Sequence, residues 1–350
     1  MKLSEILIKK NNNLDIFRLL AASLVVYGHA GAIAPGSNWT DFVIYLVGFD
    51  YSGSLAVKTF FFLSGLVVTN SLLHNSDIPR FIINRAFRIF PALIAVVLIS
   101  AILIGPVVSS LPFHQYFADG TVYSYIGDNV IFKTAYILPG VFDDNPYPSA
   151  VNGSLWSLAY EVALYIGLLV LYFIGIFKSR IALFALFFLF LLDPLIGNQL
   201  LFAHRPANHE IDYLLPCFAI GVMFACFKES LPINVFSVVF FLVGFLYFKG
   251  TIIQAYCFYV FLFVSILYMA SRSWLIRFKP SKDLSYGIYL WGFVIQQTMI
   301  YWFPGQGTAT NALASLAATF VIAWGSWHFI EKPAVQLGYR LAESLRVRVN

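Results

Sequence analysis

The amino-acid sequence predicts an all-α, polytopic integral membrane helix bundle of about ten transmembrane helices, and three observations lead to this fold class. Hydrophobic residues make up 60% of the 350 residues and charged residues only 11%, whereas a soluble domain carries about 25% charged residues. The mean hydropathy is +0.79, and too little polar surface remains to cover so apolar a chain in water. Apolar runs of roughly 17 to 25 residues recur, the length that crosses about 30 Å of hydrocarbon. Lipid is therefore the expected solvent.

Ten apolar segments are candidates for transmembrane helices. No small-residue cleavage site follows the first of them, so we expect a retained helix and not a removed signal peptide. The segments 181–198 and 233–248 are short, which leaves an odd number of spans open. The predicted spans are about residues 14–34, 53–73, 87–110, 154–177, 181–198, 211–227, 233–248, 252–271, 284–303 and 309–330.

Basic residues are distributed asymmetrically between these spans. With the N-terminus in the cytoplasm, all but four of the 22 lysines and arginines lie in cytoplasmic segments or helix ends, as the positive-inside rule predicts. The exceptions are Lys58, Lys133, Arg205 and Lys249. Both termini are therefore predicted to be cytoplasmic. The same bias accounts for the net charge of +5, so membrane lipids are expected partners and nucleic acid is not.

The chain is predicted to be one transmembrane domain over residues 1–335, followed by a cytoplasmic basic tail at 336–350. Its longest outer connection, about residues 111–153, includes the turn-rich sequence DDNPYP. A connection of this length is usually functional or folded over the bundle as a lid. The alternative is a passive connector.

Two ionisable residues share one face of the first predicted helix. Arg18 and His29 are eleven residues apart, which at about 100° per residue is three turns plus about 20°, with an axial separation of about 16 Å. The topology places Arg18 near the cytoplasmic boundary and His29 toward the outer side, with Asp15 close to the arginine. Ionisable groups at membrane depth are functional candidates, although a lone helical histidine is usually structural.

The next candidates lie in the second predicted span and at the cytoplasmic end of the third. Ser64 precedes Gly65, a pair that allows close helix packing and needs no functional explanation. Arg85 and Arg88 are spaced i, i+3 on one helical face, so their guanidinium groups could fork onto a phosphate or pyrophosphate. Charges that set the topology, or that contact anionic lipid, would produce the same pattern.

Two glutamates complete the set of candidates. Glu161 lies about two turns into the hydrocarbon from the outer side, where a carboxylate must be protonated, paired or hydrated. Its expected partner is a histidine or arginine on another helix, for function or as a structural ion pair. Glu331 precedes Lys332 and Pro333, and a helix-end ion pair is the simpler reading of that spacing.

Together these motifs resemble the acyltransferase family 3 of membrane proteins, which includes bacterial O-acetylases of lipopolysaccharide O-antigen and exopolysaccharide. Each motif alone is weak, but the ordered set is specific and extends over nearly the whole chain. It consists of Arg18 and His29 with ten residues between them, FFFLSG around Ser64, Arg85-x-x-Arg88 followed by Pro91, WSLAYE from Trp156 through Tyr160 to Glu161, SYGIYL from Ser285 and Tyr286, and IEKP with Glu331.

The resemblance implies transfer of an acyl group, usually acetyl from acetyl-CoA, to a hydroxyl of a glycan or lipid-linked glycan at the bacterial inner membrane. It implies that Arg18 and His29 are an essential pair and that Arg85 and Arg88 contact the CoA phosphates. The chain departs from many relatives at Gly292, where they carry a histidine. No metal is expected, since the three cysteines lie inside apolar stretches without metal-type pairing.

Acyl transfer to an alcohol needs a base near the hydroxyl and a donor held in line. We expect His29 to be that base, because its unperturbed pKa lies near 6.5, and Glu161 to orient or balance it. The pantetheine arm of CoA would run beside Arg18. A covalent acyl-histidine relay is an alternative. A transporter or flippase is the competing class, because intramembrane ionisable residues also line proton pathways.

Overall fold

The computed structural model describes residues 1–36, 39–75, 77–197, 200 and 211–349, and over these residues the chain is helical. The only β-pairing among them consists of two isolated bridges, one of which joins Lys2 to Pro232. The predicted all-α fold class is therefore confirmed. Arg205, one of the four basic residues assigned to the outer side, lies outside the described residues.

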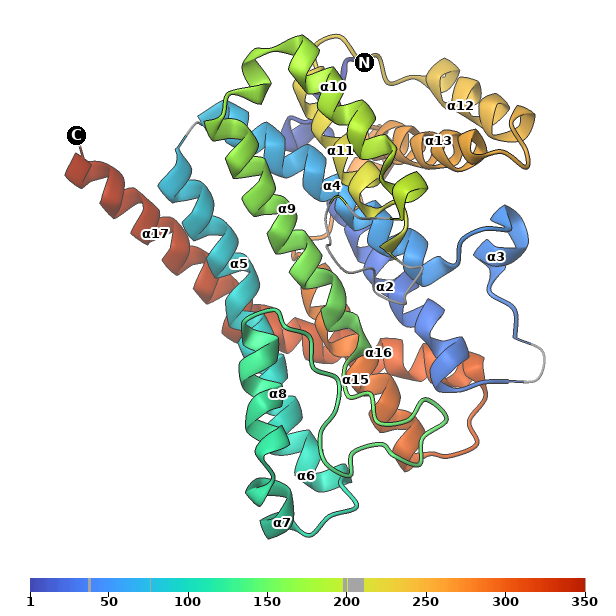
Figure 1. Ribbon diagram of the computed structural model, residues 1–350, viewed down its shortest axis with the longest axis vertical. Coiled ribbons are helices and arrows are strands. Elements are labelled where there is room, and N and C mark those ends of the chain that lie inside the picture. Colours follow the sequence, from blue (N-terminus) through green and yellow to red (C-terminus); the bar gives the residue numbers. More distant parts are fainter. Residues whose placement is uncertain (37–38, 76, 198–199, 201–210, 350) are drawn as a thin grey trace. The chain divides into compact units, whose positions relative to one another are not determined.

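The chain forms two compact units built from interleaved segments. Unit 1 comprises Met1–Ala21, Ser54–Ser76 and Ala163–Ser281, and unit 2 comprises Ala22–Gly53, Asp77–Val162 and Lys282–Asn350. Three helices belong to both units, because each begins in one and continues into the other: α2 (Leu14–Ile33), α4 (Ser52–Asn75) and α9 (Trp156–Phe173) (Figure 1).

Every predicted span contains a helix, and among the described residues six helices are long and apolar enough to cross a membrane. The length of the first is close to the prediction, whereas the third begins earlier than expected. Asp77 caps it there by accepting a hydrogen bond from the Arg80 backbone N–H at 3.0 Å. The six are Leu14–Ile33, Ser52–His74, Ile78–Val108, Gly153–Phe173, Ile252–Ala270 and Thr308–Leu345.

Three of the remaining apolar helices are shorter: α10 (Arg180–Leu191), α11 (Leu214–Cys226) and α12 (Val235–Tyr247). Twelve or thirteen residues extend only about 20 Å at 1.5 Å per residue, less than the hydrocarbon thickness. Helix α10 ends early because the Asp193–Pro194 turn follows it. The ninth predicted span, 284–303, corresponds to α15 (Ser285–Trp302), with 18 residues.

In unit 1, α4 and α11 pack backbone to backbone at two glycines. A Cβ atom on Gly65 would lie 2.3 Å from the carbonyl oxygen of Phe218, and one on Gly221 would lie 2.3 Å from that of Phe62. The close packing predicted for the Ser64–Gly65 pair is confirmed. Unit 1 also contains α10 and α12, together with α1 (Leu3–Ile6), α13 (Ile252–Ala270) and α14 (Ser273–Ile276).

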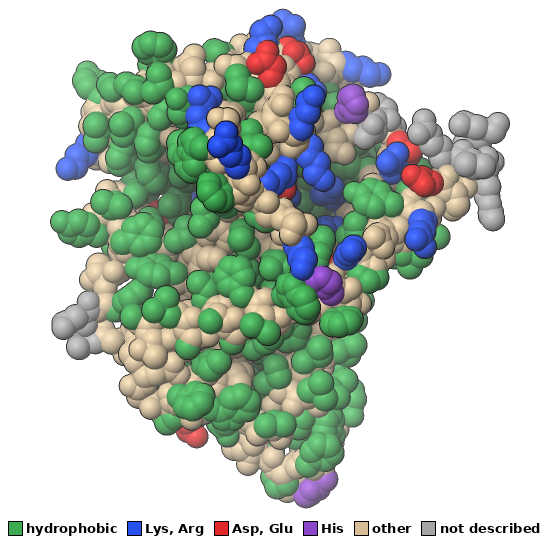
Figure 2. All heavy atoms as spheres, turned by 180° about the vertical axis from the view of Figure 1, so that it is seen from behind, with side chains coloured by type: hydrophobic (Ala, Val, Ile, Leu, Met, Phe, Trp, Pro, Cys, Tyr) green, Lys and Arg blue, Asp and Glu red, His purple; other side chains and the backbone are tan. Residues whose placement is uncertain are grey.

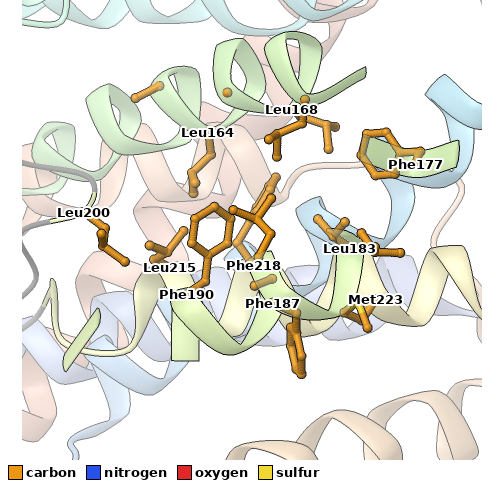
Figure 3. Close-up of a pocket in the computed structure, with 16 residues that line it drawn as sticks. Leu164, Leu168, Phe177, Leu183, Phe187, Phe190, Leu200, Leu215, Phe218 and Met223 are labelled. Carbon is orange, nitrogen blue, oxygen red and sulfur yellow. The ribbon is translucent and has the colours of Figure 1, made fainter. Parts of the chain in front are cut away.

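Unit 1 also encloses a cavity of about 280 Å³ between the second half of α9 and helices α10 and α11. Figure 3 shows its walls, with Leu164 and Leu168 on α9 facing Phe190 on α10 and Phe218 on α11. Every lining residue is apolar. This cavity therefore supplies no acid, base or charge for a reaction.

In unit 2, α5 (Ile78–Ile99) packs against α17 (Lys332–Val349), and α15 packs against α16 (Thr308–Ser326) (Figure 1). Helix α5 continues through a π-helical turn into α6 (Gly105–Val108). The long connection at 111–153 carries α7 (Phe113–Ala118) and α8 (Gly120–Val130). Helix α3 (Phe42–Val47) lies between α2 and α4 in the chain.

The surface agrees with a membrane environment. Figure 2 shows hydrophobic side chains over much of the visible face. Large apolar side chains such as Ile181, Phe236 and Phe329 are at least 80% exposed, which water would penalise and lipid does not.

Candidate active site

His29 lies in the last third of α2, in unit 2, and its ring packs against α15. The ring centroids of His29 and Phe293 are 5.1 Å apart in an edge-to-face arrangement. One residue earlier on α15, Gly292 lets the two helices approach, because a Cβ atom there would lie 2.5 Å from Cγ2 of Val26. A histidine at position 292 would require the side chain of Val26 to shift.

A buried amide network holds α2 one turn before His29. Nε2 of Gln296 donates to the carbonyl oxygen of Val26 at 2.8 Å and lies 3.3 Å from Oδ1 of Asn311. Nδ2 of Asn311 donates in turn to the carbonyl oxygen of Gln296 at 3.3 Å. Both amides are fully buried, so these hydrogen bonds link α2, α15 and α16 where water cannot compete.

Another side of α2 is held by the first residues of α4. A Cβ atom on Gly28 would lie 2.5 Å from the backbone nitrogen of Gly53. Buried Asp41 accepts hydrogen bonds from both the backbone N–H and the hydroxyl of Ser52. The backbone beside His29 is thus packed on two sides, which gives the ring a defined position.

A second cluster is centred on Arg88. Its Nη2 atom lies 2.6 Å from Oδ2 of Asp283, and its Nη1 atom lies 3.5 Å from Oε2 of Glu331. The side chain of Glu331 is only 1% exposed. The sequence favoured an ion pair of Glu331 at its own helix end. In the structure the cation beside Glu331 is Arg88 of α5, 243 positions away in the sequence.

Aromatic and hydroxyl side chains complete this cluster. The guanidinium of Arg88 lies 5.6 Å from the ring centroid of Tyr286 and 5.9 Å from that of Trp327, within the range of cation–π attraction. The hydroxyl of Tyr286 donates to the carbonyl oxygen of Ile89 at 2.9 Å. The ring therefore cannot move independently of α5.

The two carboxylates of the cluster are held by serines. Ser285 donates from its hydroxyl to Oδ1 of Asp283 at 2.6 Å, and Ser326 donates to Oε1 of Glu331 at 3.0 Å. Glu331 lies in a π-helical turn, Trp327–Glu331, a local widening that is frequent at functional sites. Charge-assisted hydrogen bonds of this kind orient a carboxylate toward its cation.

Arg85 differs from Arg88 in its surroundings. It is half-buried, and within the described ranges of the chain its guanidinium makes no side-chain hydrogen bond or ion pair. Its positive charge is therefore available to an anion, whereas two carboxylates already neutralise Arg88.

Glu161 lies on the first half of α9, in unit 2, and its charge interacts with Arg88. Two neighbours on this helix are the aromatic pair Trp156 and Tyr160, whose ring centroids are 5.4 Å apart. Ser157 forms a 2.6 Å hydrogen bond with the hydroxyl of Tyr289 on α15. The motif that ends at Glu161 therefore contributes to the same unit as His29 and Arg88.

The remaining predicted residues belong to unit 1. Arg18 is half-buried on α2, and α2 is one continuous helix from Arg18 to His29, as predicted. Asp15 pairs with Lys279 at 3.7 Å. The hydroxyl of Ser64 forms a 2.6 Å hydrogen bond with that of Tyr165, which gives this serine a structural role.

Sequence reasoning missed five residues of the site. Asp283 lies two residues before the first residue of the SYGIYL motif, and Gln296 and Gln297 are two adjacent amides in an otherwise apolar helix. Two adjacent polar residues in an apolar span were a sequence signal that could have identified Gln296 and Gln297. Phe293 and Asn311 carried none, because an aromatic residue or a single amide in an apolar span is common.

Comparisons with known proteins identify the family of the chain. A family model described as an acyltransferase domain matches residues 11–329. An O-acetyl transferase of Shigella phage Sf6 is 26% identical over 339 residues, which cover 92% of this chain and 96% of that protein. Nodulation protein 10 of Rhizobium leguminosarum bv. viciae is 32% identical over 170 residues, 45% of this chain and 43% of that protein.

No solved structure matches the chain significantly. The family match nevertheless includes almost every candidate position, from Arg18 and His29 to Tyr286, and ends two residues before Glu331. The chain belongs to acyltransferase family 3, and it is a multi-pass membrane O-acyltransferase.

Proposed function

We propose that this acyltransferase moves an acyl group, acetyl in the first instance, from acyl-CoA on the cytoplasmic side of the bacterial inner membrane to a hydroxyl of a cell-surface glycan such as O-antigen or exopolysaccharide. The observation that carries the proposal is the position of His29, an ionisable ring packed on Phe293 within the apolar part of unit 2. The name of the phage relative, an O-acetyl transferase, supports acetyl as the group transferred.

In the proposed reaction His29 removes the proton from the acceptor hydroxyl. The resulting oxygen nucleophile attacks the thioester carbonyl carbon, and the C–S bond breaks as the ester bond forms. The thiolate of CoA leaves with the electron pair and takes the proton back from the imidazolium of His29, which restores the base. The products are the glycan ester and free CoA, so atoms and charge balance without a metal.

The donor site of the proposal lies at the Arg85 and Arg88 face of α5. Arg85 offers an uncommitted positive charge to a CoA phosphate. Arg88 is held by Asp283 and Glu331 and keeps the adjoining helices in place. Its remaining N–H groups can donate hydrogen bonds to a CoA phosphate. In the proposal the pantetheine arm of CoA runs beside Arg18, Glu161 orients or balances His29, and both termini are cytoplasmic, as the distribution of basic residues predicts.

The direct test uses the purified full-length chain in lipid nanodiscs with acetyl-CoA labelled in the acetyl group. We expect release of free CoA that depends on an added bacterial glycan, and label in base-labile esters of that glycan. A second measurement compares the mass spectra of surface glycans from cells with and without the protein. Absence of both CoA release and added acetyl mass would contradict the proposal.

A further inference from the structure

The end of the long connection, residues 142–152, is a rigid platform on α15 and not a mobile lid. Its centre is clamped by Gln297, which is fully buried. Nε2 of Gln297 donates to the carbonyl oxygens of Tyr147 and Ala150 at 2.7 and 2.8 Å. Nδ2 of Asn145 donates back to the carbonyl oxygen and Oε1 of Gln297 at 3.0 and 2.9 Å. We call residues 142–152 the platform.

The far end of the platform is fastened to the same helix. Nδ2 of Asn152, which is fully buried, donates to the carbonyl oxygen of Leu290 at 2.9 Å. Directly after it, Gly153 lies so close to α15 that a Cβ atom would be 2.5 Å from the ring of Phe293. Breaking the hydrogen bonds between buried side-chain amides and backbone groups is energetically costly, so the platform keeps one conformation.

The platform presents one aromatic side chain to the surroundings. Tyr147 is 42% exposed between two exposed prolines, Pro146 and Pro148, which restrict the backbone on both sides. Its ring packs edge-to-face on Phe293 with centroids 5.8 Å apart, and Phe293 packs in the same way on His29 at 5.1 Å. A single ring therefore separates the exposed tyrosine from the proposed base.

We propose that Tyr147 is the sugar-binding subsite for the acceptor: the exposed face of its ring stacks on the C–H face of a pyranose and brings a hydroxyl of that sugar to His29. This inference rests on the proposed function and adds the residue that selects the acceptor. Aromatic faces are electronegative and attract the positive C–H edges of a ring.

The chemistry around Tyr147 suits a sugar better than a lipid chain or a peptide. Asp143 and Asp144 are exposed on the same platform, and carboxylates accept hydrogen bonds from hydroxyl groups. Asp143 already accepts one from Ser149 at 2.8 Å, which fixes its direction. A surface that combines one exposed ring with oriented acceptors matches a molecule that has an apolar face and a hydroxylated edge.

The test compares two kinds of acceptor at equal hydroxyl concentration: methyl hexopyranosides, which have a ring face, and glycerol, which has none. Labelled acetyl-CoA is the donor for the full-length chain in nanodiscs. We expect wild-type protein to favour the hexopyranosides, and Tyr147→Ala to lower that preference about tenfold, the value of an aromatic contact of about 1.4 kcal/mol. Tyr147→Phe and Tyr147→Trp should keep it.

The matched control is Tyr123→Ala, because Tyr123 is an exposed tyrosine on α8 within the same connection and should leave the preference unchanged. Equal loss of transfer to glycerol and to hexopyranosides in Tyr147→Ala would mean a purely structural role and would overturn the inference. An unchanged preference for hexopyranosides in Tyr147→Ala would also overturn it. So would a wild-type protein that shows no preference between the two kinds of acceptor. Failure of the proposed function looks different, since wild-type protein would then acetylate neither kind of acceptor.

Discussion

At the scale of single residues, His29 is distinguished by how completely its backbone is held. Gly28 packs on the backbone of Gly53, and the carbonyl oxygen of Val26 accepts from Gln296. Such support places a general base within the small tolerance that proton transfer requires. The sequence predicted a functional role for His29 because an ionisable side chain at membrane depth is energetically unfavourable. The structure adds the contacts that position it.

His29→Ala should lower the turnover of acetyl-CoA in the presence of glycan by about 100- to 10,000-fold, the range that general-base catalysis contributes. The amount of protein in the membrane should not change, because the ring is only half-buried. His114→Ala, at an exposed histidine of α7, is the control and should behave as wild type. Residual turnover near wild type would exclude His29 as the base.

The two arginines of α5 should respond differently to removal. Arg85→Ala should raise the KM for acetyl-CoA with little change in Tm, since Arg85 makes no ion pair among the described residues. Arg88→Ala should also lower Tm, because it leaves Asp283 and buried Glu331 without their cation, a loss of about 3 kcal/mol for a buried pair.

A second variant separates the two effects at Arg88. In Arg88→Ala combined with Glu331→Gln, the buried charge of Glu331 is gone while the charge of Asp283 stays, so part of the Tm should return while the KM for acetyl-CoA stays high. Both quantities can be measured by CoA release and by thermal unfolding in nanodiscs. An unchanged KM for acetyl-CoA in Arg85→Ala would mean that Arg85 only helps to set the membrane topology.

At the scale of elements, glycines decide which helices can approach each other. Gly167 lies on the cavity side of α9, where a Cβ atom meets nothing within 4 Å. Gly221 lies on α11, where a Cβ atom meets the carbonyl oxygen of Phe62. Gly167→Ala should therefore stabilise by up to about 1 kcal/mol through helix propensity.

Gly221→Ala is the opposite case on a neighbouring helix. It should destabilise by about 1–3 kcal/mol, because the α4–α11 contact must open to admit the methyl group. Thermal unfolding of both variants in nanodiscs measures the difference. The same sign of ΔTm for both would contradict the packing described for unit 1.

Helix boundaries were predictable where local chemistry sets them. The predicted span 252–271 corresponds to Ile252–Ala270, and 14–34 corresponds to Leu14–Ile33. The third span differed, because the predicted start at 87 followed hydropathy alone, whereas the Asp77 cap and Pro79 begin the helix at Ile78. Hydropathy locates the hydrocarbon-facing part of a helix and not its capped end.

At the scale of the whole molecule, the distribution of basic residues predicts an orientation that labelling can test. In a variant whose three native cysteines are replaced by alanine, Tyr123→Cys should react with a membrane-impermeant maleimide in intact cells. Ser344→Cys on α17 should react only after the membrane is permeabilised. Both positions are exposed, so the reverse pattern would place the termini outside.

Residues 111–153 were predicted to be functional or folded over the bundle as a lid, with a passive connector as the alternative, and tertiary contacts show how this connection is attached. The connection contains α7 and α8, and its last part is the platform fastened by Gln297 and Asn152. No local pattern predicts these contacts, because their partners lie 138 to 152 positions away.

The sequence by itself determined the lipid environment, the helical class, the positions of the spans and the family. These follow from local properties, since each helix in lipid must satisfy its own backbone hydrogen bonds within its own segment. Only the tertiary structure decided that Glu331 and Asp283 share Arg88, that Gln296 holds the helix of His29, and that Tyr147 lies one ring away from His29. Those contacts join residues far apart in the chain, and their geometry arises when the helices of unit 2 pack.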